Sequence, residues 1–484
     1  MTPPNILIFM SDQEQAKLLD PTHPCHTPHA ARLASEGITF RSAYCPAPHC
    51  CPSRATFMTG MYPSRHGVFN NVSNPAAISR GLTDGVHTFS EQLQTAGYRL
   101  AFSGKWHVTD EENPADRGWQ ELFTTAGKGS YMHAGLESYR SMERNDQPRQ
   151  YGQIKRPGWG DIQLFDAYKS GGEKGYEDHK DYRVARAACE ALPELAASDR
   201  PWVLFVGTIG PHDPFVVPQR FLDLYRIEDI PLPPNFGDAM RDKPAVYQRM
   251  RDQYWGQLSE TEVKDAIRHY WAYCSMIDAM FGEVLETLEK TGQAENTLVL
   301  RTSDHGEYAG AHGLFFKGVP AFREGYHIPA IVRYPAKISA PGGSVDAFVS
   351  LADFAPTFLE LAGLTPPNNL SGSSLIPFLS GITPTDWRDA HYTQLNGVEL
   401  YYSQRSVQTQ RHKYVYNGFD FDELYDLDKD PHELKNVAAD PAYAEIKRHL
   451  VKKMWRFAAA EGDERLFNPY GTVALAPWGP GEAL

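Results

Sequence analysis

Short apolar runs alternate with amphipathic stretches along most of the chain. The runs that predict buried strands span Asn5–Met10, Arg99–Ser103, Trp202–Gly207, Thr297–Thr302 and Ala330–Arg333. Between them, apolar residues recur at three- and four-residue spacing, which is the period of a helix that buries one face. Such alternation is typical of parallel strands joined by helices. We therefore predict an α/β fold with a large, mostly parallel sheet between two layers of helices.

Local signals mark where several of these helices begin and end. Thr27 followed by a proline opens one helix, and Gly37 closes it. Thr88-Phe89-Ser90-Glu91 has the sequence of a capping box at the start of another. The longest periodic segment, from Val263 to Lys290, predicts a long helix packed on the core.

The pattern changes near Pro384. Short stretches with strand-like composition follow and predict an antiparallel sheet, namely His391–Gln394, Tyr401–Gln404, Ser406–Gln410 and Lys413–Tyr416. A helix is predicted from about Pro441 to Glu461. We expect a large N-terminal domain over residues 1–383, a smaller C-terminal α+β domain over 384–466, and a tail over 467–484.

The segment Ala126–Glu177 and the tail lack a clear period. The segment is rich in Gly, Tyr, Arg and Pro, and we expect it to cross the functional face, because irregular segments of this length are usually functional. The tail carries apolar side chains that are costly to leave in water. We expect it to serve as an arm that caps the site or joins subunits of a homo-oligomer; its apolar residues are Phe467, Tyr470, Leu475, Trp478 and Leu484.

Composition narrows the classes of partner. The chain has 484 residues, a net charge of −13 and no Lys/Arg-rich block, which argues against nucleic acid or an anionic membrane as partner. No run of about 18 apolar residues could span a membrane. Six cysteines in a chain of this length do not form a disulfide framework, and no secretory signal pattern precedes the first strand. We therefore expect a cytoplasmic protein.

Polar residues of the same chemical kind follow four of the five predicted strands. Ligands of open α/β sheets bind at the carboxyl ends of the strands, so these residues should meet at one edge. Carboxylates with a histidine suit a divalent cation, whereas lysines with histidines suit an anion and proton transfer. The residues are Asp12-Gln13, Lys105-Trp106-His107, His212-Asp213 and Asp304-His305, with Lys317 a short loop later.

A further motif runs from Cys50-Cys51-Pro52-Ser53-Arg54 to Thr59-Gly60. Pro52 favours a first helical turn, which puts Cys50 at a helix N-terminus, where anions are stabilised. Taken alone, the two adjacent cysteines are also consistent with a structural cysteine pair in a turn. The whole motif, however, resembles that of the type I sulfatases of the alkaline phosphatase superfamily. In that family the first cysteine, here Cys50, is oxidised to formylglycine, whose hydrate is the nucleophile.

The resemblance extends over roughly residues 4–460. Pro4-Asn5-Ile6-Leu7 with Ser11-Asp12-Gln13, and Ser303-Asp304-His305-Gly306, are similar to the two metal segments of the family. Further matches are Lys105 and His107, Gly210-Pro211-His212, Lys317, the stretch from Tyr62-Pro63 through His66-Gly67 to Asn71, and Leu424-Tyr425-Asp426-Leu427 with Asp430-Pro431 and Glu433. The fold implied is the alkaline phosphatase-like sandwich.

The resemblance implies a sulfatase that hydrolyses an aryl or small alkyl sulfate to alcohol and inorganic sulfate. One divalent metal, Ca²⁺ first and Mn²⁺ as the alternative, would be held by Asp12, Asp304, His305 and the side chain at position 50. The implied partners are a small anionic sulfate ester and a formylglycine-generating enzyme. The implied catalytic residues are Cys50, Arg54, Lys105, His107, His212 and Lys317, and the implied substrate contacts are Gln13 and Asn71.

Two positions depart from the common pattern of the family. Many relatives have two acidic residues where this chain has Asp12-Gln13, and Asn where it has His305. Choline sulfatases and phosphonate monoester hydrolases resemble this chain in both pairs, but the latter generally lack the block kept here as Lys105 and His107. Sulfate esters are therefore the first choice, and phosphonate monoesters or phosphodiesters are the alternative. A binder without catalysis is disfavoured by the intact cysteine motif.

Overall fold

The computed structural model describes residues 3–74, 77–127, 147–167, 175–397, 401–467 and 478–483. Its main sheet has the strand order β12-β2-β11-β10-β1-β8-β3-β4. All neighbours in this sheet are parallel except β11, which runs antiparallel to both β10 and β2. The strands are β1 (Asn5–Ser11), β2 (Ile38–Tyr44), β3 (Arg99–Lys105), β4 (Gln120–Ala126), β8 (Trp202–Gly207), β10 (Thr297–Ser303), β11 (Ala330–Arg333) and β12 (Gly343–Ser350).

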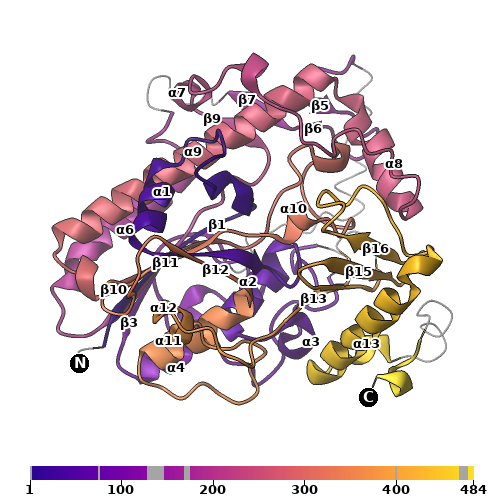
Figure 1. The fold of residues 1–484 in the computed structure, drawn as a ribbon. Helices are drawn as coiled ribbons and strands as arrows, with labels where there is room; N and C mark the ends of the chain where they lie inside the picture. Colours follow the sequence, from indigo (N-terminus) through magenta and orange to yellow (C-terminus); the bar gives the residue numbers. More distant parts are fainter. Residues whose placement is uncertain are drawn as a thin grey trace.

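Helices cover both faces of this sheet, so the predicted α/β sandwich is confirmed (Figure 1). On one face lie α1 (Pro28–Glu36), α6 (Lys180–Ala196) and the long α9 (Glu260–Lys290). On the other lie α2 (Cys50–Thr59), α4 (Phe89–Thr95), α11 (Phe354–Leu361) and α12 (Ile376–Leu379). The shorter elements are α3 (Pro63–His66), α7 (Gln219–Leu222), α8 (Ala245–Gln253), α10 (Arg323–Tyr326), β5 (Gln153–Ile154), β6 (Ile162–Gln163), β7 (Phe165–Ala167) and β9 (Phe215–Val217).

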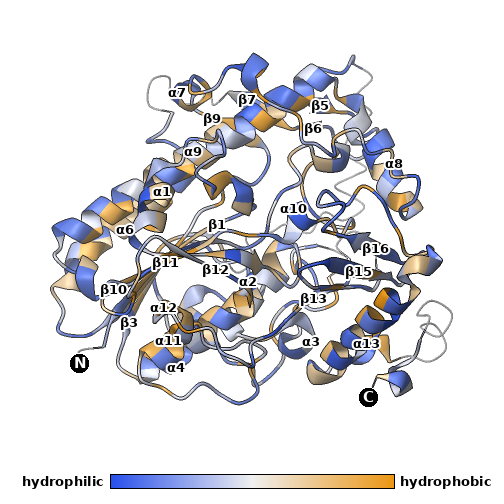
Figure 2. Cartoon of the chain, in the orientation of Figure 1, coloured by the Kyte–Doolittle hydropathy of each residue, from blue (hydrophilic) through white to orange (hydrophobic). Residues whose placement is uncertain are grey.

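The core lies where the sheet meets its two layers of helices. Every residue of the central strands β1, β8 and β10 is buried. The covering helices carry hydrophobic and hydrophilic residues in turn, as Figure 2 shows for α9. Removing this apolar surface from water is the main favourable contribution to folding. The central strands are thereby fixed, and the residues at their carboxyl ends with them.

All five strands predicted for the sheet are present, and three further strands were missed. The run Ala330–Arg333 forms a strand as predicted, but it is the antiparallel one. The missed strands are β2, β4 and β12, and each includes exposed or half-buried residues. A strand with solvent on part of its length lacks the continuous apolar run of a central strand. Their positions were therefore set by pairing with neighbours.

The C-terminal part has a sheet of its own, in the order β13-β14-β15-β16. Its strands are β13 (His391–Leu395), β14 (Gln404–Gln408), β15 (His412–Asn417) and β16 (Glu423–Asp426), all antiparallel, and α13 (Ala444–Ala460) packs against them. The strand predicted over Tyr401–Gln404 was wrong, because β14 begins only at Gln404. The predicted small α+β part is confirmed, and the boundary at residue 384 stays a prediction.

This second sheet braces a loop of the first part. The Gln404 side-chain amide donates to the carbonyl oxygen of Val319 at 2.9 Å. Lys413 forms an ion pair with Glu433 at 2.7 Å and donates to the carbonyl oxygen of Ala321. The segment just after Lys317 is therefore held from outside by the C-terminal strands.

The predicted tail and the predicted excursion lie partly outside the described residues. Of the tail, Phe467 and residues 478–483 are described; the Trp455 indole donates to the carbonyl oxygen of Trp478 at 2.7 Å, and Arg448 pairs with Glu482. These residues thus pack on α13 of their own chain. A contact of the tail with a second subunit stays a prediction. Within the described ranges, no helix has the length and apolarity needed to cross a membrane.

Candidate active site

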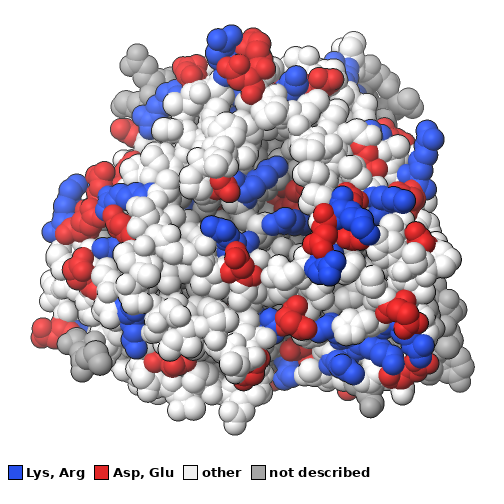
Figure 3. All heavy atoms as spheres, in the orientation of Figure 1, with Lys and Arg blue, Asp and Glu red and all other residues white. Residues whose placement is uncertain are grey.

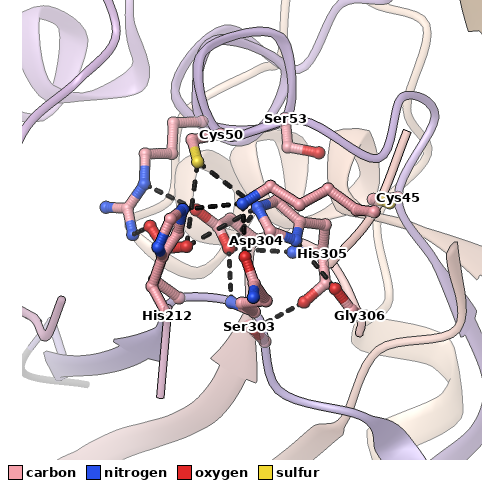
Figure 4. A network of polar contacts seen from close by, with 12 residues as sticks. Cys45, Cys50, Ser53, His212, Ser303, Asp304, His305 and Gly306 are labelled. Carbon is pink, nitrogen blue, oxygen red and sulfur yellow. Dashed lines mark hydrogen bonds and ion pairs between the residues drawn. The ribbon is translucent and has the colours of Figure 1, made fainter. Parts of the chain in front are cut away.

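The polar residues that follow β1, β3, β8 and β10 converge at one edge of the sheet, as predicted. The N-terminus of α2 points at the same place and brings Cys50 there (Figure 4). Its first turn contains Pro52, and Gly60 ends it in a left-handed conformation with φ of 72°. Every residue of α2 is buried. Cys50 is thus a fixed group at a helix N-terminus, where the unpaired N–H groups favour negative charge.

Asp12, Cys50, Asp304 and His305 form the centre of the site. One potential ligand atom from each lies within 4.8 Å of the others. Cys50 Sγ is 3.3 Å from His305 Nε2 and 3.7 Å from Asp12 Oδ1. The other ring nitrogen of His305 contacts the carbonyl oxygen of Gly306 at 2.9 Å, which orients Nε2 toward the centre, as for a metal-ligating histidine. Two carboxylates and an imidazole are a donor set that fits one divalent cation.

Arg54, one helical turn after Cys50, holds the two carboxylates in place. Its Nε donates to Asp304 at 2.8 Å and its Nη2 donates to Asp12 at 3.3 Å. The remaining guanidinium group, Nη1, donates to the carbonyl oxygen of Lys105 at 2.8 Å. A planar guanidinium with several donors is suited to such a bridge. Arg54 therefore joins α2 to the ends of three strands.

Lys105 ends β3 and forms an ion pair with Asp12 at 2.5 Å. Burial opposes ionisation of Asp12, but Lys105, His212 and Arg54 outweigh it and hold its pKa well below the usual range. Gly104 makes this approach feasible, because a Cβ there would lie 1.9 Å from the carbonyl oxygen of Gly207 on β8. Its φ of 110° is also in the region that favours glycine.

His212 and Lys317 lie together on the side of the site that borders solvent. Lys317 Nζ is 2.6 Å from His212 Nε2, and His212 Nδ1 is 3.2 Å from a carboxylate oxygen of Asp213. Burial and Lys317 oppose the charge of His212, but Asp213, Cys50 and Asp12 outweigh them and raise its pKa. Cys50 and the same two carboxylates likewise raise the pKa of Lys317 against its burial. This pair can donate protons as well as positive charge.

Gln13 lies beneath this pair. Its amide oxygen accepts a hydrogen bond from Lys317, and its amide nitrogen donates to Asp213 at 3.1 Å and to Glu307 at 2.5 Å. Its backbone N–H donates to Asp304. Both ends of the predicted substrate contact are therefore engaged within the protein.

Glu307 is fully buried beside Gln13. Burial raises the pKa of Glu307 to about 8, although the N–H donors of Ala309 and Phe316 favour the charged form. Glu307 belongs to the network but was not among the predicted site residues, and Asp213 was predicted to reach this edge of the sheet but was given no role. The signal for both was present in the sequence, since each carboxylate lies within three residues of a predicted site histidine.

His107 and Asn71 complete the predicted set. His107 is buried, and burial together with Lys105 and Arg54 lowers its pKa well below the usual value, so the ring is neutral. Asn71 uses its side-chain oxygen to accept from the backbone N–H of Cys51 at 3.0 Å. This bond satisfies a donor at the start of α2. Contact of Asn71 with substrate through its amide nitrogen stays a prediction.

Comparison with known proteins places this geometry in a family. The pattern of the sulfatase family matches residues 4–364, which is most of the chain. This protein belongs to the sulfatase family. A second pattern, described as the C-terminal part of N-sulphoglucosamine sulphohydrolase, matches residues 310–460. The predicted membership of the alkaline phosphatase superfamily is confirmed, and this sulfatase is a sulfuric ester hydrolase.

Two relatives and one solved structure illustrate the range of similarity. The sulfatase is 31% identical to a choline-sulfatase of Rhizobium meliloti, over 90% of this chain and 83% of that protein. It is 28% identical to an N-acetylglucosamine-6-O-sulfatase of Bacteroides thetaiotaomicron, over 93% and 85%. A phosphonate monoester hydrolase from Silicibacter pomeroyi shares the fold with a TM-score of 0.76, 24% identity and 96% of each chain covered.

The charge of the site contrasts with that of the molecule as a whole. The chain carries a net charge of −13, and the face in Figure 3 shows Lys and Arg interspersed with Asp and Glu. At the site, three permanent cations, Arg54, Lys105 and Lys317, converge on one small volume. A divalent cation bound by the central group would add to them. A small anionic sulfate ester is the substrate that such a pocket attracts.

Proposed function

We propose that this protein hydrolyses the sulfate monoester of an aryl or small alkyl alcohol, giving the alcohol and inorganic sulfate. The observation that carries the proposal is the convergence of Cys50 with His305, Asp12 and Asp304, whose carboxylates are paired with Arg54 and Lys105. Catalysis of sulfuryl transfer needs positive charge held where the sulfuryl oxygens will lie, and Lys105 and Lys317 supply it.

The nucleophile is formylglycine made from Cys50 by a formylglycine-generating enzyme. Cys50 Sγ marks the place where the hydroxyl groups of the hydrated aldehyde would lie. Cys51 has a different environment: its sulfur accepts from the backbone N–H of Val72, and burial raises its thiol pKa well above the usual range. Cys51 is therefore an inert packing residue.

Asp12, Asp304, His305 and the modified residue 50 would hold one divalent metal, with Ca²⁺ favoured by the carboxylates and Mn²⁺ as the alternative because of the imidazole. When bound, such an ion acts as a Lewis acid that lowers the pKa of a hydroxyl group. Arg54 donates to both Asp304 and Asp12 and holds the two carboxylates in position for this role.

Proton transfers fall to two histidines. In this scheme one hydrate oxygen, deprotonated with the help of the bound ion, would form a bond to sulfur while the bond from sulfur to the alcohol oxygen breaks, and His212 would give its proton to the departing oxygen. His107, neutral because of burial and the cations beside it, would then accept the proton of the second hydroxyl. The bond from carbon to the sulfate oxygen would break, which releases sulfate and re-forms the aldehyde, and addition of water would restore the hydrate.

A phosphonate monoester or phosphodiester hydrolase is the second candidate, because a phosphonate monoester hydrolase shares the fold over 96% of both chains. The experiment compares 4-nitrophenyl sulfate with 4-nitrophenyl phenylphosphonate, which release the same phenol. We expect kcat/KM for the sulfate to be at least about tenfold higher than for the phosphonate. The reason is that Lys105 and His107, the block that phosphonate monoester hydrolases generally lack, are both in the site. The reverse order would assign the second function.

The alcohol half of the ester is sought with a panel of aryl, choline and sugar sulfates, with inorganic sulfate as the readout. We propose a cytoplasmic location because no disulfide joins the six cysteines, all of which lie in the described ranges, as expected in a reducing compartment.

A further inference from the structure

The hydrogen bonds around Gln13 fix which way its side-chain amide faces. Three polar groups surround the amide: the carboxyl groups of Asp213 and Glu307, each with an oxygen that accepts from the amide nitrogen, and the ammonium of Lys317, which only donates. Only one orientation satisfies all three, with the nitrogen toward the carboxylates and the oxygen toward Lys317. Gln13 is fully buried, so a wrong orientation would have no water to compensate it.

Glu307 also acts on the backbone that carries Lys317. Its second carboxylate oxygen accepts from the backbone N–H groups of Ala309 and Phe316, at 3.0 and 2.5 Å. Ala309 and Phe316 both have positive φ, 45° and 69°, so these bonds hold residues in an unfavourable conformation. Phe316 directly precedes Lys317. Glu307 thus holds the backbone of Lys317 with one oxygen and its ammonium group, through Gln13, with the other.

We propose that Glu307 is a positioning residue for the acid side of the site, which acts through Gln13 to hold Lys317 against His212. Gln13 is then part of this support. The inference rests on the proposed function, because it assigns a role in the protonation of the leaving alcohol. Among the described residues, the side-chain carboxyl group of Glu307 bonds to Gln13, Ala309 and Phe316. Within this part of the chain, it makes no hydrogen bond to the group formed by Asp12, Cys50, Asp304 and His305.

The substitution Glu307→Gln tests the contact with Gln13 separately from the contact with the backbone. The new amide oxygen still accepts from Ala309 and Phe316, but an NH₂ group replaces the oxygen that faced Gln13. Two NH₂ groups cannot pair, so the Gln13 amide must rotate or lose its partner. Rotation turns its NH₂ toward the ammonium of Lys317, which breaks that bond.

The experiment is a double-mutant cycle on wild type, Glu307→Gln, Gln13→Leu and the double variant, with 4-nitrophenyl sulfate and an alkyl sulfate. Each single variant should lower kcat for the alkyl sulfate by about 10–100-fold, as for other residues that orient functional groups. The loss should be smaller for 4-nitrophenyl sulfate, whose phenol leaves without a proton. The double variant should be within about threefold of the worse single variant, because both changes remove one contact.

Glu14→Gln is the matched control. Glu14 is a fully buried glutamate next to Gln13, but it pairs with Arg301 and Ser11, away from Lys317. This change should lower the melting temperature and leave the leaving-group dependence of kcat as in wild type. Melting temperature and metal content are measured for every variant.

Losses that multiply in the double variant, or that are equal for both substrates, would overturn the inference, because Glu307 would then serve only the structure. If wild type hydrolyses phosphonates and no sulfate ester, the proposed function fails instead. In that case the same cycle on an alkyl phosphonate monoester still decides whether Glu307 acts through Gln13.

Discussion

Two buried networks of charge show how differently this molecule uses ionic side chains. In the C-terminal part, Arg405 and Asp463 are both fully buried and form two hydrogen bonds, at 2.5 and 2.9 Å. The remaining donors of Arg405 reach backbone carbonyls and the side-chain oxygen of Asn396, and Tyr392 donates to Asp463. This pair balances one charge with one charge, and its polar groups are directed at each other.

The active site is arranged in the opposite way. Lys105 and Arg54 both pair with Asp12, Arg54 also pairs with Asp304, and the ammonium of Lys317 is 2.6 Å from His212 Nε2. Such crowding of like charges costs free energy unless a ligand relieves it. We infer from the comparison that the Arg405–Asp463 network serves stability, whereas the network at the active site serves the binding of an anion. Substitutions should therefore act on stability in one network and on turnover in the other.

The largest expected effect is that of Cys50→Ala. It removes the proposed nucleophile and should lower kcat by about 10⁴-fold or more, with little change in melting temperature. Cys51→Ala is the matched control and should keep most of the activity. Peptide mass spectrometry of protein made with the modifying enzyme should find the aldehyde at position 50. Fully active protein with both cysteines as thiols would contradict the prediction.

The next effect is that of Asp304→Ala. It removes a proposed metal ligand and leaves Arg54 Nε without its carboxylate partner. Bound metal and activity should be lost together, as measured by elemental analysis and by kcat. Asp346→Ala, at an exposed carboxylate, is the control. Wild-type protein that keeps full activity after exhaustive chelation, with no metal detected, would show that no metal takes part.

His212→Ala should produce an effect that depends on the leaving group. For alkyl sulfates, kcat should fall by about 10²–10⁴-fold, because the departing oxygen needs a proton. For an ester of a strongly acidic phenol, the loss should be far smaller. The slope of log kcat against the pKa of the leaving alcohol measures this. An equal loss for all esters would assign His212 to charge stabilisation alone.

The smallest effect on turnover is expected from Asp463→Ala. It leaves Arg405 buried without its partner and should lower the free energy of unfolding by about 3–5 kcal/mol. The kcat per folded molecule should stay near that of wild type. Asp389→Ala removes an exposed partner of Lys453 and should cost about 1 kcal/mol or less. Denaturant unfolding measures the free energy of unfolding of both variants. Equal losses of stability in the two variants would show that the buried pair contributes no more than the exposed one.

The sequence predicted best those strands and helices that bury one or both faces along their whole length. The strand over Trp202–Gly207 has the predicted bounds, and the helix that Gly37 follows begins and ends as predicted. Central strands and amphipathic helices carry their pattern locally, because one or both faces are buried along their whole length. Strands such as β2 and β4 lack that pattern, since their partners, and not their composition, keep them in the sheet.

By itself, the sequence determined the chemical types at the site: Cys50 with its motif, two aspartates, two lysines and the histidines, each next to a predicted strand or helix end. Only the tertiary structure decided which side chains face one another. It engaged both ends of the Gln13 amide and turned the Asn71 oxygen to the start of α2, and it brought Glu307 beneath Lys317. The reason is physical: residue type fixes what a group can donate or accept, whereas its partners come from distant strands that only packing brings together.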